Sequence, residues 1–193
     1  RSKIVFAYPA DTCATLQMFA SEKLGDIWTE PLALEGLSDS ASVNYPYMMS
    51  DGVTLYFASQ DKEGLGGYDI YMTRWDDDSK TFYKPENIGM PFNSEANDYL
   101  YIIDEFNQLG WFATDRGLNS DSVCLYTFIP TDSRRIYNAQ ELGYDTLVNL
   151  ANINCIRDTW VDRIEVKKAM DRLEEIKKTS KRAEVNAFSF IIN

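Results

Sequence analysis

Acidic side chains are abundant in this sequence, but their spacing singles out no catalytic pair. The chain of 193 residues has 30 Asp and Glu residues and no His. Glycoside hydrolysis needs two carboxyl groups about 5 to 10 Å apart across a cleft. The acids available for such chemistry are scattered along the chain: Asp51, Asp61, Asp69, Glu95, Asp98, Asp104 and Asp115. The lack of histidine also removes the commonest general base and triad member, so we predict a protein that is not an enzyme and has no catalytic residues.

Three further motifs resemble binding sites only in part. The run Asp76-Asp77-Asp78 offers the oxygen ligands that Ca²⁺ prefers, but adjacent acids beside Ser79 are typical of an exposed hairpin tip. The segment 64–67 has three glycines but lacks the lysine and the helix of a phosphate-binding loop. The three cysteines, at 13, 124 and 155, are too far apart for a CxxC metal site and are expected to be buried thiols. We therefore predict no bound metal and no cofactor.

Aromatic side chains are the remaining candidates for binding, since they make up 13% of the chain. An exposed Trp or Tyr can stack on a sugar or anchor a protein interface. The four residues selected as ligand or partner contacts are Trp75, Tyr83, Trp111 and Tyr137. A place in the hydrophobic core is the alternative for each of them.

The elements that must position these residues form an internal repeat. Tyr56-Phe57-Ala58-Ser59 reappears 55 residues later as Trp111-Phe112-Ala113-Thr114, and the same shift maps 69–71 onto 124–126. A shorter copy lies upstream, where 18–21 matches 56–59. Repeats with a period of about 40 to 50 residues are typical of propeller blades.

The middle repeat predicts four short strands joined by hairpin turns. The strands are expected at 45–49, 54–59, 68–74 and 81–83, the last running on to 88. Sheets this small cannot bury both faces alone, so they must stack, and radial stacking of four-stranded sheets makes a propeller. The residues expected between sheets are Tyr47, Leu55, Phe57, Ile70, Met72, Tyr101, Leu109, Phe112, Leu125 and either Thr127 or Phe128. The predicted fold class is thus mainly β, with about three antiparallel β-propeller blades.

The middle repeat also resembles a known family. Residues 50–59 followed by 64–71 look like the WD40-like repeat of TolB-type β-propellers, and 85–89 with 92–94 resembles the connector between such blades. The resemblance covers residues 3–143 and implies a scaffold for protein or glycan contacts in the envelope of Gram-negative bacteria, in the periplasm or at the outer membrane. Closed propellers have about four to eight blades, so we expect this chain to be a piece of a larger one, with earlier blades before Arg1.

Two segments are predicted, with blades in 1–145 and a helical C-terminal part in 146–193. Helices are expected over 147–156 and 158–180, the second capped by Asp158 or Thr159. Its apolar stripe consists of Val161, Ile164, Met170, Leu173 and Ile176. This stripe would pack on the blades or on a following domain, or else bind a partner or a membrane surface. The end, 187–192, alternates like a strand and is expected to continue into a further domain.

Net charge limits the partners. The formal charge of −11 repels phosphate backbones and anionic lipids, so no nucleic acid partner is predicted. No run of about 18 apolar residues is present, so no transmembrane segment is predicted in this chain. We therefore expect a non-catalytic interaction or scaffold module that binds an envelope protein through its propeller. The alternatives are a carbohydrate-binding or glycan-processing propeller and a purely structural spacer.

Overall fold

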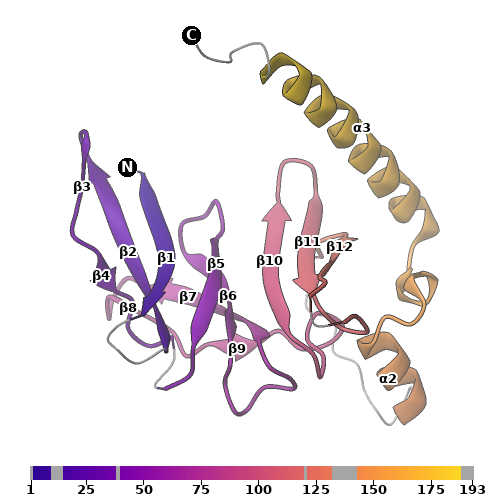
Figure 1. Ribbon diagram of the computed structural model, residues 1–193, viewed down its shortest axis with the longest axis horizontal. Helices are drawn as coiled ribbons and strands as arrows, with labels where there is room; N and C mark the ends of the chain where they lie inside the picture. Colours follow the sequence, from indigo (N-terminus) through magenta and orange to yellow (C-terminus); the bar gives the residue numbers. More distant parts are fainter. Residues whose placement is uncertain (1, 10–14, 38–39, 120, 132–142, 188–193) are drawn as a thin grey trace.

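The protein is described by a computed structural model that covers residues 2–9, 15–37, 40–119, 121–131 and 143–187. Figure 1 shows three antiparallel sheets side by side in chain order, followed by a helical segment. The prediction of a mainly β fold with a C-terminal helix is confirmed. Within the described part of the chain the sheets form an open row, and no closed propeller or barrel is present.

The sheets contain all the strands of the described residues. The first consists of β1 (Lys3–Pro9), β2 (Leu16–Leu24), β3 (Ile27–Trp28) and β4 (Leu32–Ala33). The second consists of β5 (Val43–Met48), β6 (Thr54–Ser59), β7 (Asp69–Asp76), β8 (Thr81–Phe82) and β9 (Glu86–Asn87). The third consists of β10 (Asp98–Asp104), β11 (Leu109–Thr114) and β12 (Cys124–Phe128).

The second sheet follows the strand prediction closely. The turn before β6 forms because the Asp51 carboxylate accepts hydrogen bonds from the backbone N–H groups of Val53 and Thr54, both at 2.8 Å, while Gly52 adopts a positive φ of 68°. The predicted last strand is divided into β8 and β9, which both pair with β7. Pro85 lies between them, and a proline has no N–H to donate to a sheet.

The first sheet corrects the predicted alignment of the repeat. β2 pairs with β3 and β4 as β7 pairs with β8 and β9: Lys23 faces Trp28 as Trp75 faces Phe82. The hydroxyl of Ser21 donates to the carbonyl of Thr29 at 2.7 Å, as the hydroxyl of Thr73 donates to that of Tyr83 at 2.6 Å. β2 is therefore equivalent to β7 and β1 to β6, so the predicted match of 18–21 with 56–59 is wrong. Both β2 and β6 carry an aromatic residue before a small one. A match of four residues is therefore too short to show which strand is the equivalent of β2.

The second sheet buries both of its faces. The core cluster between it and the first sheet contains Met18, Leu37, Val43, Leu55, Phe57, Tyr71 and Phe82. The cluster on its other side contains Ile70, Tyr101 and Phe112, with Tyr56 and Phe128 packed against them. Successive side chains of a strand point to opposite faces, so adjacent residues such as Tyr56 and Phe57 join different clusters. Each sheet thus packs on the next one in the row.

Most residues expected between the sheets are buried, with one clear exception. Leu55, Phe57, Ile70, Tyr101, Leu109 and Phe112 are buried, and Tyr47, Met72 and Phe128 are half-buried. Leu125, in contrast, is 60% exposed, and Thr127 is also exposed. The prediction for Leu125 is wrong because it lies on the face of β12 opposite to Phe128 and Tyr126, which point into the second core cluster.

The helical segment contains α2 (Tyr144–Ala151), a short 3₁₀ helix η1 (Ile156–Thr159) and α3 (Arg163–Ala187). Both predicted caps of the long helix are wrong, since 156–159 form η1 and the Asp162 carboxylate accepts the N–H groups of Ile164 at 2.7 Å and Glu165 at 3.3 Å. No described helix is long and apolar enough to cross a membrane. The strand expected at the end of the chain lies outside the described residues beyond Ala187.

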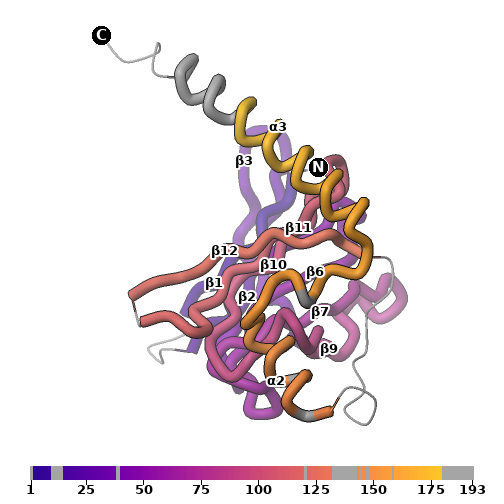
Figure 2. The backbone as a smooth tube through the Cα atoms, turned by 90° about the vertical axis from the view of Figure 1, so that its right-hand side faces the viewer, coloured from indigo at the N-terminus to yellow at the C-terminus, as the bar shows by residue number. Residues whose placement is uncertain are grey.

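The long helix makes little contact with the sheets. Arg172 donates to the carbonyl of Gln108 at 3.5 Å, and Ala169 is buried, but Val161, Ile164 and Met170 of the predicted apolar stripe are exposed. Figures 1 and 2 show that α3 runs away from the row of sheets. The cysteines were also mispredicted in part, because Cys155 is exposed and Cys124 half-buried, while Cys13 lies outside the described residues.

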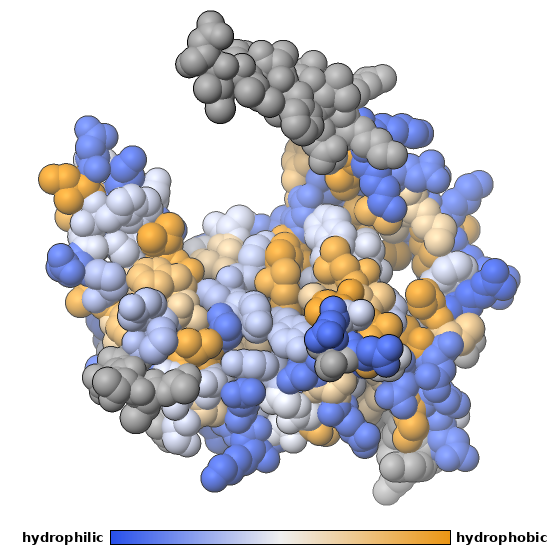
Figure 3. All heavy atoms as spheres, viewed as in Figure 1, coloured by the Kyte–Doolittle hydropathy of each residue, from blue (hydrophilic) through white to orange (hydrophobic). Residues whose placement is uncertain are grey.

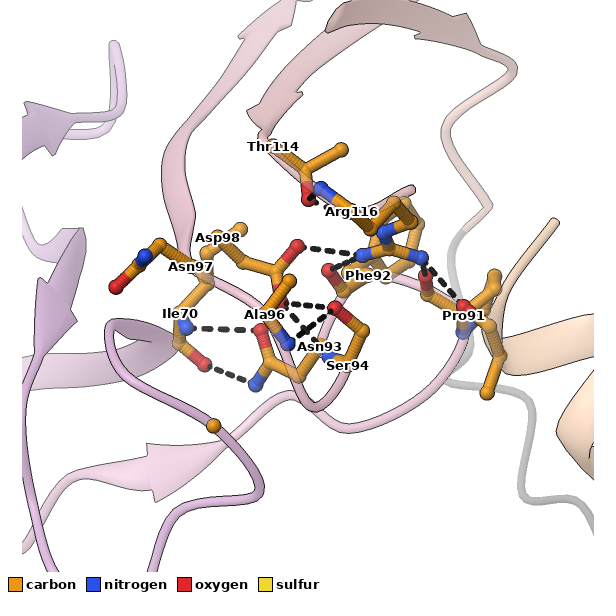
Figure 4. A network of polar contacts seen from close by, with 12 residues as sticks. Ile70, Pro91, Phe92, Asn93, Ser94, Ala96, Asn97, Asp98, Thr114 and Arg116 are labelled. Atoms are coloured by element: carbon orange, nitrogen blue, oxygen red, sulfur yellow. Dashed lines mark hydrogen bonds and ion pairs between the residues drawn. The ribbon is translucent and has the colours of Figure 1, made fainter. Parts of the chain in front are cut away.

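A buried arginine ties the third sheet to the segments around it (Figure 4). The Arg116 guanidinium donates to the Asp98 carboxylate at 2.5 Å, to the Thr114 hydroxyl at 3.1 Å and to the carbonyls of Pro91, Phe92 and Ala151. All five of its N–H groups therefore have an acceptor. This network connects β10, β11, the loop before β10 and the end of α2.

Removing this charge should destabilise the fold strongly. In Arg116→Met the Asp98 carboxylate stays buried without its counter-ion, a change that costs about 3 to 5 kcal/mol. Urea unfolding followed by circular dichroism measures the difference. The control Lys80→Met breaks an exposed ion pair with Asp77 at 3.1 Å and should change the stability far less, because solvent screens the pair. Equal effects of the two substitutions would contradict this account.

Candidate functional site

The structure describes three of the four predicted aromatic residues, Trp75, Tyr83 and Trp111, and does not gather these three into one site. The Trp75 ring packs edge-on against Phe82 at 5.2 Å between ring centres, and the Lys3 ammonium lies 5.8 Å from the Trp75 ring centre. Trp75 therefore joins the first two sheets. Tyr83 is exposed at the end of β8, and Trp111 is half-buried on β11 of the third sheet. Tyr137 lies outside the described residues.

The acidic residues have local structural partners. The Asp51, Asp76 and Asp104 carboxylates accept hydrogen bonds from N–H groups two or three residues ahead in their turns. Asp98 is in the ion pair with Arg116. Within the described ranges no group of three Asp, Glu or Cys side chains is arranged to hold a metal ion.

Asp69 is the buried carboxylate with the least complete set of partners. Its Oδ2 atom accepts the N–H groups of Leu65 at 2.7 Å and Gly66 at 3.0 Å, which fixes the glycine-rich loop. Its Oδ1 atom is buried and has no hydrogen-bond partner. Burial raises the pKa of Asp69 above its usual value, despite the two N–H groups that act to lower it. Burial of this carboxylate in its charged form therefore costs stability.

The outer face of the first sheet is the most unusual apolar surface of the described residues. We use this name for Ile4, Phe6, Phe19 and Trp28. The other face of the same strands carries Val5 and Met18, which pack into the first core cluster. Ile4 is 45% exposed and Trp28 is 42% exposed. Figure 3 shows apolar residues at the surface over this sheet, on the left of the molecule.

In the repeat, the outer face of the first sheet is equivalent to the face of the second sheet that packs on the first. In the corrected alignment Ile4 corresponds to Leu55, which is 0% exposed, and Trp28 corresponds to Phe82, which is 5% exposed. The Phe6 and Phe19 rings stack at 6.2 Å and 26°, and the equivalent Phe57 and Tyr71 rings stack at 6.1 Å and 23°. The first sheet covers the Phe57 and Tyr71 stack of the second sheet, whereas the equivalent stack of the first sheet is half-buried and lies beside the exposed Ile4 and Trp28.

Sequence reasoning missed this surface because it aligned β2 with β6. The pattern Ile4-Val5-Phe6-Ala7 against Leu55-Tyr56-Phe57-Ala58 was the signal that could have revealed the equivalence. Comparison of the chain with protein-family models, with curated proteins and with solved structures found no match. The chain's own repeat is therefore the guide to the role of this face.

The variant Asp69→Asn should become more stable relative to the wild type as the pH rises. A carboxyl group whose native pKa is raised binds its proton more tightly in the folded state, so the wild type loses stability as pH rises through that pKa. Asparagine cannot ionise, and its amide oxygen can still accept from Leu65 and Gly66. Urea unfolding at a series of pH values between about 3 and 7 measures the change.

Asp51→Asn is the matched control and should show the opposite slope. Burial acts to raise the pKa of Asp51, but the hydrogen bonds from Thr54 and Val53 outweigh it and lower the pKa. The wild type therefore gains stability from Asp51 above its ordinary pKa and loses it as pH falls. Parallel pH profiles for the two variants would contradict the assignment of Asp69 as a costly buried charge.

Proposed function

We propose that this chain is a non-catalytic interaction module built from propeller-type blades, and that it docks through the outer face of the first sheet. The observation that carries the proposal is the half-buried Phe6 and Phe19 stack, which lies between the exposed side chains of the outer face and has the geometry of the buried Phe57 and Tyr71 stack. Large apolar side chains gathered on one accessible face of a sheet favour an interaction site there.

The internal contacts support another sheet of the same kind as the partner. Between the first and second sheets, Val5 and Met18 pack against Leu55 and Phe57. The covering surface is thus a sheet face of small and aliphatic side chains, laid on an aromatic face. We infer that the partner presents an antiparallel sheet whose face resembles that of Val5, Met18 and Ala20.

The energetics favour such a contact over a merely exposed patch. Burying one large apolar side chain contributes about 1.5 to 3 kcal/mol, and interface energy concentrates on central aromatic residues. Phe6, Phe19 and Trp28 supply three of them on one face. Since the pairing of Phe6 with Phe19 is fixed by the β1–β2 register, little freedom is lost on binding.

The resemblance of 50–59 and 64–71 to the WD40-like repeat supports two further parts of the proposal. It favours blades that belong to a larger propeller, and it favours the periplasm or the outer membrane as the location. The helical segment lies beside the third sheet, where the end of α2 accepts a hydrogen bond from Arg116. The proposed contact uses the opposite end of the row (Figure 1).

A photo-reactive amino acid at position 19 tests the proposed contact. In the envelope of the cell that makes the protein, we expect cross-links to a β-strand of a repeat of the same kind, identified by mass spectrometry. Trp28→Ala should weaken this contact by about tenfold or more, because a central aromatic residue is worth at least about 1.4 kcal/mol.

The same amino acid at position 106 provides the control. Phe106 is an exposed aromatic residue in the turn between β10 and β11, outside the outer face. Equal cross-linking from positions 19 and 106 would refute the proposal. Cross-links from position 19 only to glycans or to proteins without such a repeat would refute it as well.

A further inference from the structure

Three tyrosine rings meet at the junction of the second and third sheets. Tyr45 comes from β5, Tyr68 directly precedes β7, and Tyr99 comes from β10. The Tyr45 ring centre lies 5.9 Å from that of Tyr68 and 5.4 Å from that of Tyr99, edge-on to both. The Tyr68 and Tyr99 ring centres are 6.1 Å apart. We call these residues the tyrosine cluster.

The backbone is strained where the cluster is most exposed. Tyr45 has a φ of 53°, in the left-handed region that side chains other than glycine rarely adopt. This conformation costs about 1 to 2 kcal/mol, and it lies at an irregularity of the β5–β6 pairing. The Tyr45 side chain is 38% exposed. Strain of this kind is concentrated at ligand sites, where it positions a side chain.

A fixed carboxylate lies beside the rings. The Tyr99 hydroxyl donates to Asp115 Oδ2 at 2.8 Å, and the Asn97 side-chain amide donates to the same oxygen at 2.8 Å. The Asn97 backbone N–H donates to Asp115 Oδ1 at 2.8 Å, and Asn97 Oδ1 accepts the N–H of Tyr68 at 3.0 Å. Asn97 therefore holds Tyr68 and Asp115 in one rigid frame.

The charge states at neutral pH follow from these contacts. Burial acts to raise the pKa of Asp115, but the hydrogen bonds from Asn97 and Tyr99 outweigh it and lower the pKa. Burial, together with the hydrogen bond to Asp115, raises the pKa of Tyr99 to about 12. The site thus combines neutral aromatic rings with an ionised, half-buried hydrogen-bond acceptor.

We propose that the tyrosine cluster is a binding subsite for one neutral pyranose ring of a glycan. The exposed Tyr45 ring offers an apolar surface for the C–H face of a sugar. Asp115 Oδ1, which accepts one hydrogen bond from Asn97, can accept a second one from a sugar hydroxyl group. The edge-on contacts with Tyr68 and Tyr99 fix the Tyr45 ring before binding, which reduces the entropy lost.

The chemistry selects among possible ligands. The chain carries a formal charge of −11, and the charged group that Tyr99 and Asn97 bind at the cluster is a carboxylate, so uronic acids and sulfated sugars are disfavoured. Proline-rich peptides bind in grooves lined by aromatic rings. Here Tyr45 stands edge-on to its neighbours, and the fixed polar group suits a polyhydroxylated ligand better than a peptide that offers few donors.

Titration calorimetry with neutral tetrasaccharides tests this inference. The probes are maltotetraose, cellotetraose and chitotetraose, with a proline decamer as the competing ligand class. We expect at least one tetrasaccharide to bind saturably, with affinity reduced about tenfold or more in Tyr45→Ala and retained in Tyr45→Phe, because the ring supplies the contact. Asp115→Asn should also weaken binding, with unchanged circular dichroism spectra showing that both variants fold.

Phe106→Ala is the control, since it removes an exposed aromatic ring far along β10 from the cluster. Binding of none of the tetrasaccharides would overturn the inference, as would binding that Tyr45→Ala leaves unchanged. Saturable binding of the proline peptide alone would overturn it in favour of peptide recognition. The outer face of the first sheet takes no part, so failure of one proposal leaves the other standing.

Discussion

The row of sheets depends on one buried ion pair for the position of its third member. Asp98 begins β10, and its second oxygen accepts from the backbone and hydroxyl of Ser94, so the carboxylate holds the incoming loop as well as Arg116. A buried ion pair of this kind costs least when every donor and acceptor of its two partners is satisfied. Asn93 connects the same loop to the second sheet, because its side chain exchanges two hydrogen bonds with the backbone of Ile70 at 2.8 and 2.9 Å. These polar contacts therefore fix the position of the third sheet relative to the second, whereas apolar contacts alone would allow the two sheets to shift.

Sequence reasoning succeeded where local signals agree and failed where distant segments decide. The strand 54–59 was predicted correctly because an Asp-Gly turn precedes an alternating run. Asp162 was missed as a helix cap because Asp158 and Thr159 are equally good cap residues in sequence, and only the structure shows that Thr159 belongs to η1. The tyrosine cluster was missed because its members come from three segments, and nothing local marks their meeting. Leu125 was misplaced because a strand pattern cannot say whether a further sheet covers its face.

The repeat shows which exposed residues have buried equivalents in another sheet. An exposed aliphatic residue on a sheet is ordinary by itself, but Ile4 is exposed where its equivalent Leu55 is fully buried. Leu125 is likewise exposed where its equivalent Ile70 is buried. The two ends of the row thus expose residues that the interior of the row covers, and they are unlike each other. Unlike ends favour head-to-tail contacts between sheets rather than symmetric ones.

Of these two ends, the first sheet is the better docking surface for physical reasons. The third sheet already contacts its own helical segment, because Ala151 accepts from Arg116 and Ile153 packs against the second core cluster. These contacts lie at the second core cluster, whereas the opposite face of the third sheet presents Leu125, Thr127 and the ring of Trp111. At the other end, Phe6, Phe19 and Trp28 are held by the strands that carry them, with their reverse face anchored by Met18 and Val5 in the core. The rigid support behind this face means that association there costs little reorganisation, which is what distinguishes a prepared interface from an accidental apolar patch.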